Sequence, residues 1–179
     1  LAQVPVNRIA VPAKPSARKF LGTLNAKRAP MVTCILVISD PARIGLAQTT
    51  VNLWIKQTYQ AKQLVIVNAT GKPVTNAPYA WIKEIAVDPN QYATVGALRN
   101  KGIDEADGSW IMPWDDDDHA HNHRIAFQMA YRADEKCCVM LARQIRIDVR
   151  NNTVCVFKDD LAGLPSTVLF PHDSARYDD

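Results

Sequence analysis

The stretch Ser109-Trp110-Ile111-Met112-Pro113-Trp114-Asp115-Asp116-Asp117-Asp118 joins a bulky, mostly apolar run to four consecutive aspartates. The apolar run is typical of a buried strand, so we expect the four carboxylates where the chain leaves the core. Neighbouring like charges disfavour ionisation unless a cation or solvent offsets them. Hard oxygen ligands suit Mg²⁺ or Mn²⁺, which commonly bridge one or two carboxylates to substrate phosphates. The stretch therefore predicts a divalent-metal site, with a solvated acidic turn as the alternative.

Length and composition favour one α/β or α+β domain. The chain has 179 residues and 19.9 kDa, enough for a substantial core but too short for two typical domains. Its contents of 47% hydrophobic and 22% charged residues are ordinary for a globular protein. The longest apolar runs, such as residues 35–38, fall far short of the roughly 20 residues that a membrane helix needs. We therefore expect no transmembrane segment.

The cysteines indicate a reducing compartment. They show neither C-x-x-C spacing nor the density of a secreted disulfide scaffold, so we expect buried thiols and a cytoplasmic location. The four are Cys34, Cys137, Cys138 and Cys155. No secretory signal is visible, and because the chain begins at Leu1 without Met we expect a processed product or a fragment.

Charge is distributed unevenly along the chain. Residues 1–39 contain six basic and no acidic side chains, a net charge of +6, and the remainder has 15 basic and 18 acidic residues, a net charge of −3. Residues 1–30 also contain four prolines and show no helical or strand period. We interpret residues 1–30 as a basic, Pro-rich extended arm and residues 31–179 as the folded domain. We expect the arm to contact another protein or subunit; nucleic acid, the protein's own acidic body and a loose solvated tail are the alternatives.

The first half of that domain predicts a parallel βαβ unit. Residues 32–38 and 63–67 have the nearly continuous apolar pattern of buried strands, and residues 42–57 place apolar side chains at helical spacing. Asp40 in the turn between them could cap the helix. Ligands of such sheets bind beyond the carboxyl ends of the strands, which here means near Ser39, Asp40 and Asn68.

The second half continues the alternation of strands and helices. Asn122 is the expected cap of the last helix, and the fold class predicted is α/β, with a central, mostly parallel sheet flanked by helices. We expect strands at residues 81–87, 110–114, 137–141 and 166–170, helices at 96–106 and 123–133, and a hairpin that pairs 145–149 with 154–157.

Four blocks of sequence, in order, resemble the family-2 glycosyltransferases of the GT-A fold, in the nucleotide-diphospho-sugar transferase superfamily. Together they span about residues 32–133. Residues 32–40 with 52–59 are similar to the family's opening strand and its helix ending in "NQTYP" or "KQTY", 64–68 to "IIVVDDGS", 96–103 to "GxARNxGI", and 108–118 to "GexixfLDxDD". The resemblance implies a single GT-A-like, Rossmann-like domain.

The resemblance also implies roles for particular residues. Asp117, by match to the family's D-x-D motif, would be the main ligand of Mn²⁺ or Mg²⁺ together with Asp115, and Asp115 or Asp116 would face the ribose or the metal. Such a metal neutralises the diphosphate of a nucleotide sugar and stabilises the leaving group. Arg99 matches the arginine that approaches the nucleotide, with a surface ion pair as its alternative role. The implied nucleotide-binding set is Ser39, Asp40, Asn68, Arg99, Asp115 and Asp116.

Two departures from the family pattern affect activity. Asn68-Ala69 replaces the acidic pair after the second strand, so the base-reading carboxylate is lost, although an amide oxygen can still accept a hydrogen bond. Residues 164–170 look like the acceptor-side strand, after which a Glu-Asp pair supplies the general base. The sequence stops before such a pair, so we expect a domain truncated on its acceptor side. Asp173, Asp178 and Asp179 are substitute candidates for the catalytic base.

The histidines offer another metal hypothesis. His119, His121 and His123 form an alternating run after the aspartates, with His172 as a further candidate ligand. Hydrolases that carry H-x-H at a strand end need a barrel larger than this chain. We therefore expect a solvated loop or a contribution to the same divalent site.

Three functions are compatible with the sequence. The first is a metal-dependent, inverting glycosyltransferase that transfers a sugar from a nucleoside diphosphate to an unknown acceptor. The alternative is a catalytically incomplete glycosyltransferase-like module with a structural or interaction role in a larger assembly. A third is a two-metal nucleotidyl or phosphoryl transferase, for which only Asp40 is an obvious additional carboxylate.

Overall fold

The structure is a computed structural model that describes residues 29–76, 79–132, 134, 138–141, 143–148, 153–158, 167–174 and 176–178. Residues 1–28 of the predicted basic arm lie outside the described residues. The arm and its contact with another subunit therefore stay predictions.

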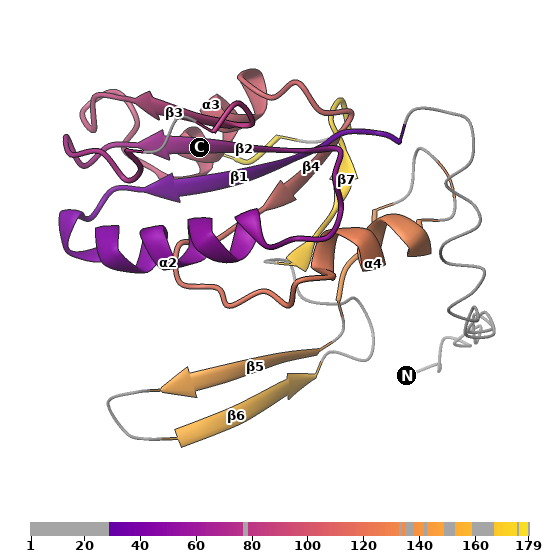
Figure 1. Cartoon of the computed structure of the whole chain (residues 1–179). Helices are drawn as coiled ribbons and strands as arrows, with labels where there is room; N and C mark the ends of the chain where they lie inside the picture. The colour runs from indigo at the N-terminus through magenta and orange to yellow at the C-terminus, as the bar shows by residue number, and fades with distance from the viewer. Residues whose placement is uncertain are drawn as a thin grey trace, which may run out of the picture.

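The sheet is built around β1 (Val32–Ile38), whose first five residues are all buried. β1 pairs in parallel with β2 (Lys62–Asn68) on one side and with β4 (Trp110–Pro113) on the other. β3 (Ile82–Ala86) extends the parallel sheet next to β2, and β7 (Phe170–Pro171) closes the other edge antiparallel to β4. The order β3-β2-β1-β4-β7 confirms the predicted central, mostly parallel sheet (Figure 1).

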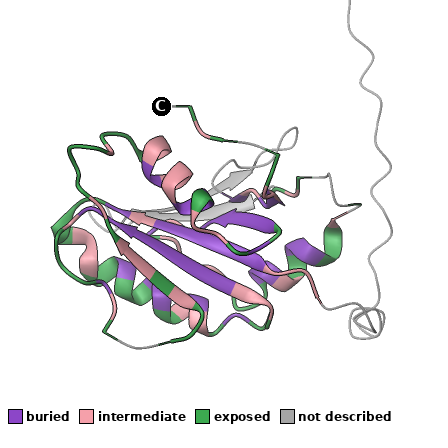
Figure 2. Cartoon of the chain, turned by 90° about the horizontal axis from the view of Figure 1, so that it is seen from above, coloured by how far each residue is buried: buried purple, intermediate pink, exposed green. Residues whose placement is uncertain are grey.

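Helices cover both faces of this sheet. Alternate side chains of β1 point to opposite faces, so Cys34 and Leu36 pack with α2 and α4, whereas Ile35 packs with α3. Figure 2 shows the buried strands between the half-exposed helices. The helices are α2 (Ile44–Ile55), α3 (Val95–Asp104) and α4 (Arg124–Tyr131), and the 3₁₀ turn η1 (Pro41–Arg43) precedes α2.

Two boundaries differ from the prediction at helix starts. The helix expected from residue 42 opens as η1, because Pro41 follows Asp40, whose side chain accepts a hydrogen bond from the N–H of Ala42. The last helix begins at Arg124 with His123 as its N-cap and no side-chain cap, so the prediction of Asn122 as the cap was wrong.

The predicted strands at residues 137–141 and 166–170 are largely replaced by side-chain hydrogen bonds. Only a single bridge, Val139 to Leu169, and β7 are formed among the described residues there. Gln128 donates to the carbonyls of Val139 and Thr167, and the Thr167 hydroxyl accepts from the N–H of Leu141. These contacts satisfy backbone groups that a strand ladder would otherwise pair.

The predicted hairpin is confirmed as β5 (Arg143–Asp148) paired antiparallel with β6 (Thr153–Lys158). Cys34 is fully buried, and burial raises the pKa of its thiol to about 12. Cys138 is exposed, so the expectation of burial was wrong for that cysteine. No helix in the described part of the chain is both long enough and apolar enough to cross a membrane.

A polar cluster fixes the connection from α3 into β4. The Thr33 hydroxyl and the N–H of Asp107 both donate to Gln63 Oε1, at 2.7 and 2.9 Å. The N–H of Gly108 in turn donates to the Thr33 hydroxyl at 2.9 Å. A Cβ at Gly108 would meet backbone atoms of Thr33 and Met31 at 2.7 and 2.8 Å, so the turn that leads into β4 has no room for a side chain at this position.

Two helical glycines make a matched test of how closely α3 packs on the sheet. A Cβ at Gly102 would collide with Cγ2 of Ile35, whereas one at Gly45 in α2 would meet nothing within 4 Å. We predict that Gly102→Ala lowers the free energy of unfolding by about 1–3 kcal/mol through overpacking. Gly45→Ala should raise it by about 0.5–1 kcal/mol through helix propensity. Urea denaturation measures both, and stabilisation by Gly102→Ala would contradict the close packing.

Candidate functional site

The predicted site residues gather where the parallel strands end, an edge we call the carboxyl edge. The register pairs Ile38 with Asn68 and Ile35 with Pro113, so the residues after β1, β2 and β4 emerge side by side. α3 starts at the same edge because it follows β3, and it carries Arg99 in its second turn. The structure therefore brings together the strand ends, Arg99 and the aspartate quartet, residues 115–118.

Each carboxylate of the quartet lies next to an arginine. These arginines come from three different elements, η1, α3 and α4, and together they offset most of the negative charge. The pairs are Asp115–Arg99 at 2.7 Å, Asp116–Arg43 at 2.5 Å, Asp117–Arg43 at 3.0 Å and Asp118–Arg124 at 3.8 Å.

The four aspartates differ in what they can do. Asp116 has an 11% exposed side chain whose two oxygens are both engaged by Arg43, and its carbonyl accepts a hydrogen bond from Thr50 at 2.9 Å. Asp117 is 55% exposed and meets Arg43 through one oxygen. Asp116 thus anchors the quartet to α2 and η1, and Asp117 presents its carboxylate to solvent.

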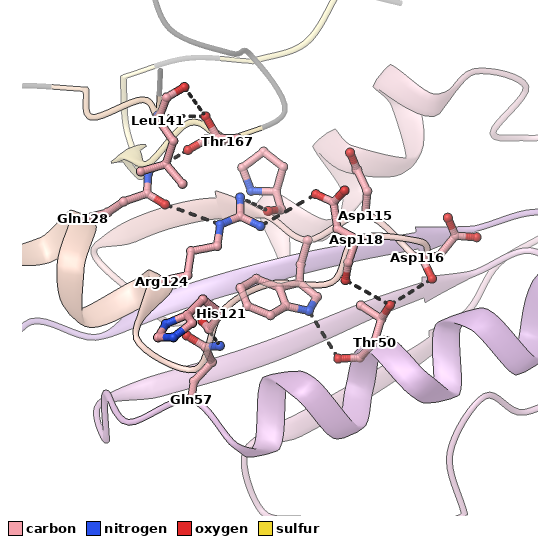
Figure 3. A network of polar contacts seen from close by, with 12 residues as sticks. Thr50, Gln57, Asp115, Asp116, Asp118, His121, Arg124, Gln128, Leu141 and Thr167 are labelled. Atoms are coloured by element: carbon pink, nitrogen blue, oxygen red, sulfur yellow. Dashed lines mark hydrogen bonds and ion pairs between the residues drawn. The ribbon is translucent and has the colours of Figure 1, made fainter. Parts of the chain in front are cut away.

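The loop after the quartet is held between α2 and α4. Arg124 has a 6% exposed side chain, lies over the Trp114 ring at 5.0 Å and donates to the carbonyl of Pro113 at 3.3 Å. Gln57, two residues after the end of α2, donates to the carbonyl of His121 at 2.8 Å (Figure 3). Burial lowers the pKa of Arg124, and the charge of Asp118 opposes that shift. These contacts fix the path of residues 115–123.

Arg99 joins the quartet to the segment that contains Tyr177. Its Nη2 donates to Asp115 at 2.7 Å, and its guanidinium lies 5.1 Å from the ring centroid of Tyr177. Its Nε is buried and has no hydrogen-bond partner among the described residues. The ion pair that was predicted as the alternative role of Arg99 is therefore present, and its partner, Asp115, belongs to the candidate site.

The segment 176–178 runs along α3 toward the site. Arg176 forms an ion pair with Asp104 at the far end of α3. The side-chain amide of Asn100 accepts a hydrogen bond from the N–H of Tyr177 and donates one to the carbonyl of Tyr177. The carbonyl of Asp178 lies where a Cβ of Gly96 would be. Burial raises the pKa of Tyr177, and the charge of Arg99 opposes that shift. The path delivers the Tyr177 ring to Arg99.

The strand-end polar residues serve local structure. Asp40 caps η1 through its 2.8 Å bond from the N–H of Ala42, and Ser39 is exposed beside it. Asn68 is 4% exposed and uses its whole amide. Its Nδ2 donates to the Lys72 carbonyl and to Glu84, and its Oδ1 accepts from the N–H and hydroxyl of Thr70. In this arrangement Asn68 shapes the loop after β2.

The candidate bases in the described chain, Asp173 and Asp178, lie at opposite edges of the sheet. Asp173 follows β7, which runs antiparallel to β4, so it lies at the opposite edge of the sheet from the quartet. Asp178 lies beside the start of α3 at the carboxyl edge, and Asp179 is outside the described residues.

The histidines show no arrangement for zinc. His123 Nδ1 is 2.8 Å from the Thr58 hydroxyl, and His172 Nε2 is 2.9 Å from the carbonyl of Ile103, at the far end of α3. Within the described ranges, no group of three or more His, Cys, Asp or Glu side chains could hold a metal ion. A divalent ion at Asp115 and Asp117 would therefore need further oxygens from a ligand such as a diphosphate.

Comparison with solved structures identifies the architecture. The mannosyltransferase PcManGT from Pyrobaculum calidifontis, in complex with GDP-Man and Mn²⁺, aligns with a TM-score of 0.54 at 15% identity, over 71% of this chain and 41% of that one. The 1–349 fragment of TarS from S. aureus aligns with a TM-score of 0.51 at 12% identity, over 79% and 47%. The chain has a GT-A-like glycosyltransferase fold. It spans less than half the length of either structure.

No protein-family model and no curated protein matches the sequence. The GT-A-like fold therefore rests on the three-dimensional likeness and on the element order.

Three residues of the candidate site were not predicted from the sequence. Arg43 and Arg124 were not predicted, although four adjacent carboxylates demand counter-charge from helices that begin at the same edge. Tyr177 was not predicted either. Its contact with Arg99 depends on the backbone path along α3, for which the sequence carried no signal.

We predict that Arg124→Met lowers the free energy of unfolding by about 2–4 kcal/mol, because it leaves the Pro113 carbonyl and the partly buried Asp118 without this partner. Arg176→Met removes an arginine from an exposed pair with Asp104 and should change stability by less than about 0.5 kcal/mol. Urea denaturation compares the two, and equal effects would show that the Arg124 contacts do not hold the loop.

Proposed function

We propose that this domain is a metal-dependent glycosyltransferase that binds a nucleoside-diphosphate sugar at the carboxyl edge and transfers the sugar to an acceptor with inversion. One observation carries the proposal. On a GT-A-like fold, the exposed carboxylate of Asp117 and the guanidinium of Arg99 flank Asp115 at the edge where α/β sheets bind ligands. The bound GDP-Man and Mn²⁺ of PcManGT support the same class of ligand here.

The residues present fit a hard divalent cation with incomplete protein ligation. Asp115 and Asp117 would hold Mn²⁺ or Mg²⁺, and phosphate oxygens of the substrate would complete the coordination. Such an ion supplies charge neutralisation of the leaving nucleoside diphosphate. The D-x-D assignment to these two residues is part of the proposal.

The other residues bind and orient the nucleotide. Arg99 would reach the diphosphate through its guanidinium, since the side chain is 22% exposed and the Tyr177 ring lies against it. Ser39 and Asp40 lie at the end of β1, where the nucleoside would sit. Asn68 supports the neighbouring loop, and with Ala69 beside it the nucleobase is read without a strand-end carboxylate.

Inversion requires a base that takes the proton of the acceptor hydroxyl opposite the leaving group. Of the candidates in the described chain, Asp178 lies at the carboxyl edge and Asp173 does not. We therefore propose Asp178 ahead of Asp173 for this role.

The alternative of a catalytically incomplete interaction module has one observation in its favour. Every aspartate of the quartet already has an arginine beside it, so three positive charges offset most of the four negative ones without a metal. A module of this kind would fold normally and would bind no nucleotide in a metal-dependent way.

Calorimetric titration distinguishes the proposed glycosyltransferase from the interaction module. We predict that GDP or UDP binds in the presence of Mn²⁺ and that binding is lost when Mn²⁺ is removed. Asp117→Ala should weaken Mn²⁺-dependent binding by at least about tenfold, since even supporting residues of metal sites are commonly worth about 10–100-fold.

Asp104→Ala is the matched control. Asp104 has a 59% exposed side chain paired with Arg176 at 3.2 Å, close to the 55% exposure and 3.0 Å pairing of Asp117, but it lies at the other end of α3. Its substitution should leave nucleotide binding unchanged. Absence of any Mn²⁺-dependent heat with either nucleotide would refute the proposed enzyme and favour the interaction module.

A further inference from the structure

Arg43 is the residue of this site whose position the proposed function does not use. It ends η1, directly after β1, and its backbone N–H bonds the carbonyl of Asp40 at 3.0 Å. Its guanidinium engages Asp116 through Nε at 2.7 Å and Nη2 at 2.5 Å. The same Nη2 lies 3.0 Å from Oδ2 of Asp117. One arginine therefore serves two of the four carboxylates.

The two contacts differ in how firmly they are held. The bond to Asp116 is bidentate and largely buried, a geometry that fixes the planar guanidinium. The contact with Asp117 is single, longer and on the open side, since the Asp117 side chain is 55% exposed. Asp116 thus holds Arg43 in place, and Arg43 in turn presents a fixed positive charge to Asp117.

That charge is permanent. An arginine guanidinium stays protonated in proteins, so deprotonation does not remove it. A divalent cation that approaches Asp117 alone therefore meets a positive charge 3.0 Å from Oδ2 of that carboxylate. Like charges at such distances repel strongly at a partly buried site.

A diphosphate changes this balance. Its oxygens carry negative charge toward both the cation and the guanidinium, and Arg43 has a 39% exposed side chain that a ligand can reach from solvent. Arginine is well suited to phosphate oxygens because of its planar set of donors. The repulsion between Arg43 and the cation is then offset by the ligand that lies between them.

We propose that Arg43 is a positioning residue that keeps Asp117 from binding a divalent cation until a nucleoside diphosphate arrives, so that cation and nucleotide bind together. This inference rests on the proposed function. It adds a role for a residue outside the D-x-D pair and gives the order of binding a physical cause.

The test measures Mn²⁺ binding without nucleotide, by the electron paramagnetic resonance signal of free Mn²⁺. Arg43→Gln should bind Mn²⁺ alone about fivefold more tightly than the unmodified chain, the size of one partly exposed ion pair. The gain in Mn²⁺ affinity on adding GDP or UDP should shrink by at least the same factor. A purely structural role would instead weaken Mn²⁺ binding.

Arg176→Gln is the matched control, because Arg176 is 50% exposed and pairs with Asp104 away from the site. It should leave both affinities unchanged. Arg43→Lys, whose single ammonium cannot hold both oxygens of Asp116 and still reach Asp117, should give a smaller gain in the same direction. If circular dichroism shows that Arg43→Gln is unfolded, Arg43→Lys replaces it in the test.

The outcomes are distinguishable. If the unmodified chain binds Mn²⁺ with nucleotide but the folded Arg43 variants show no gain for Mn²⁺ alone, the role of Arg43 is overturned and the proposed function stands. If no folded variant binds Mn²⁺ with or without nucleotide, both fail together.

Discussion

Four adjacent carboxylates can pack against a sheet only if positive charge is brought to them. Here that charge comes from Arg43, Arg99 and Arg124, which belong to three elements that meet at one edge of the sheet. The quartet therefore ties η1, α3 and α4 to the end of β4. Loss of any one arginine would change the balance of charge for its neighbours as well as for its own partner. Fold and candidate site share this electrostatic constraint.

The four aspartates of the quartet also differ in how exposed their side chains are. Asp116 is the least exposed of the four side chains, at 11%, and Asp117 is the most exposed, at 55%. Asp115 and Asp118 are intermediate, at 25% and 23%. The four residues form a turn in which the N–H of Asp118 donates to the carbonyl of Asp115 at 3.2 Å, so adjacent side chains meet different surroundings. A run of identical residues thus contains both a firmly held carboxylate, that of Asp116, and an accessible one, that of Asp117.

The sequence predicts the sheet better than it predicts the site. β1 and β2 are nearly continuous apolar runs buried on both faces, so their ends were placed within one residue. The strands around residues 139 and 169 were overestimated because Gln128 and Thr167 side chains pair the backbone there. Arg99 and the aspartates were found through local motifs. The pairing of Arg43 with Asp116 spans 73 residues, and no local pattern identifies which arginine closes such a contact.

The contacts between α3 and residues 176–178 involve main-chain atoms on one side. Asn100 bonds the peptide groups of Tyr177, and the missing side chain of Gly96 makes room for the carbonyl of Asp178. The course of this segment is therefore set largely by α3, through contacts with the main chain of residues 177 and 178. A side chain at 177 can change without loss of these contacts if the new residue keeps its backbone N–H, so the helix determines where the segment runs separately from which side chain it carries to the carboxyl edge.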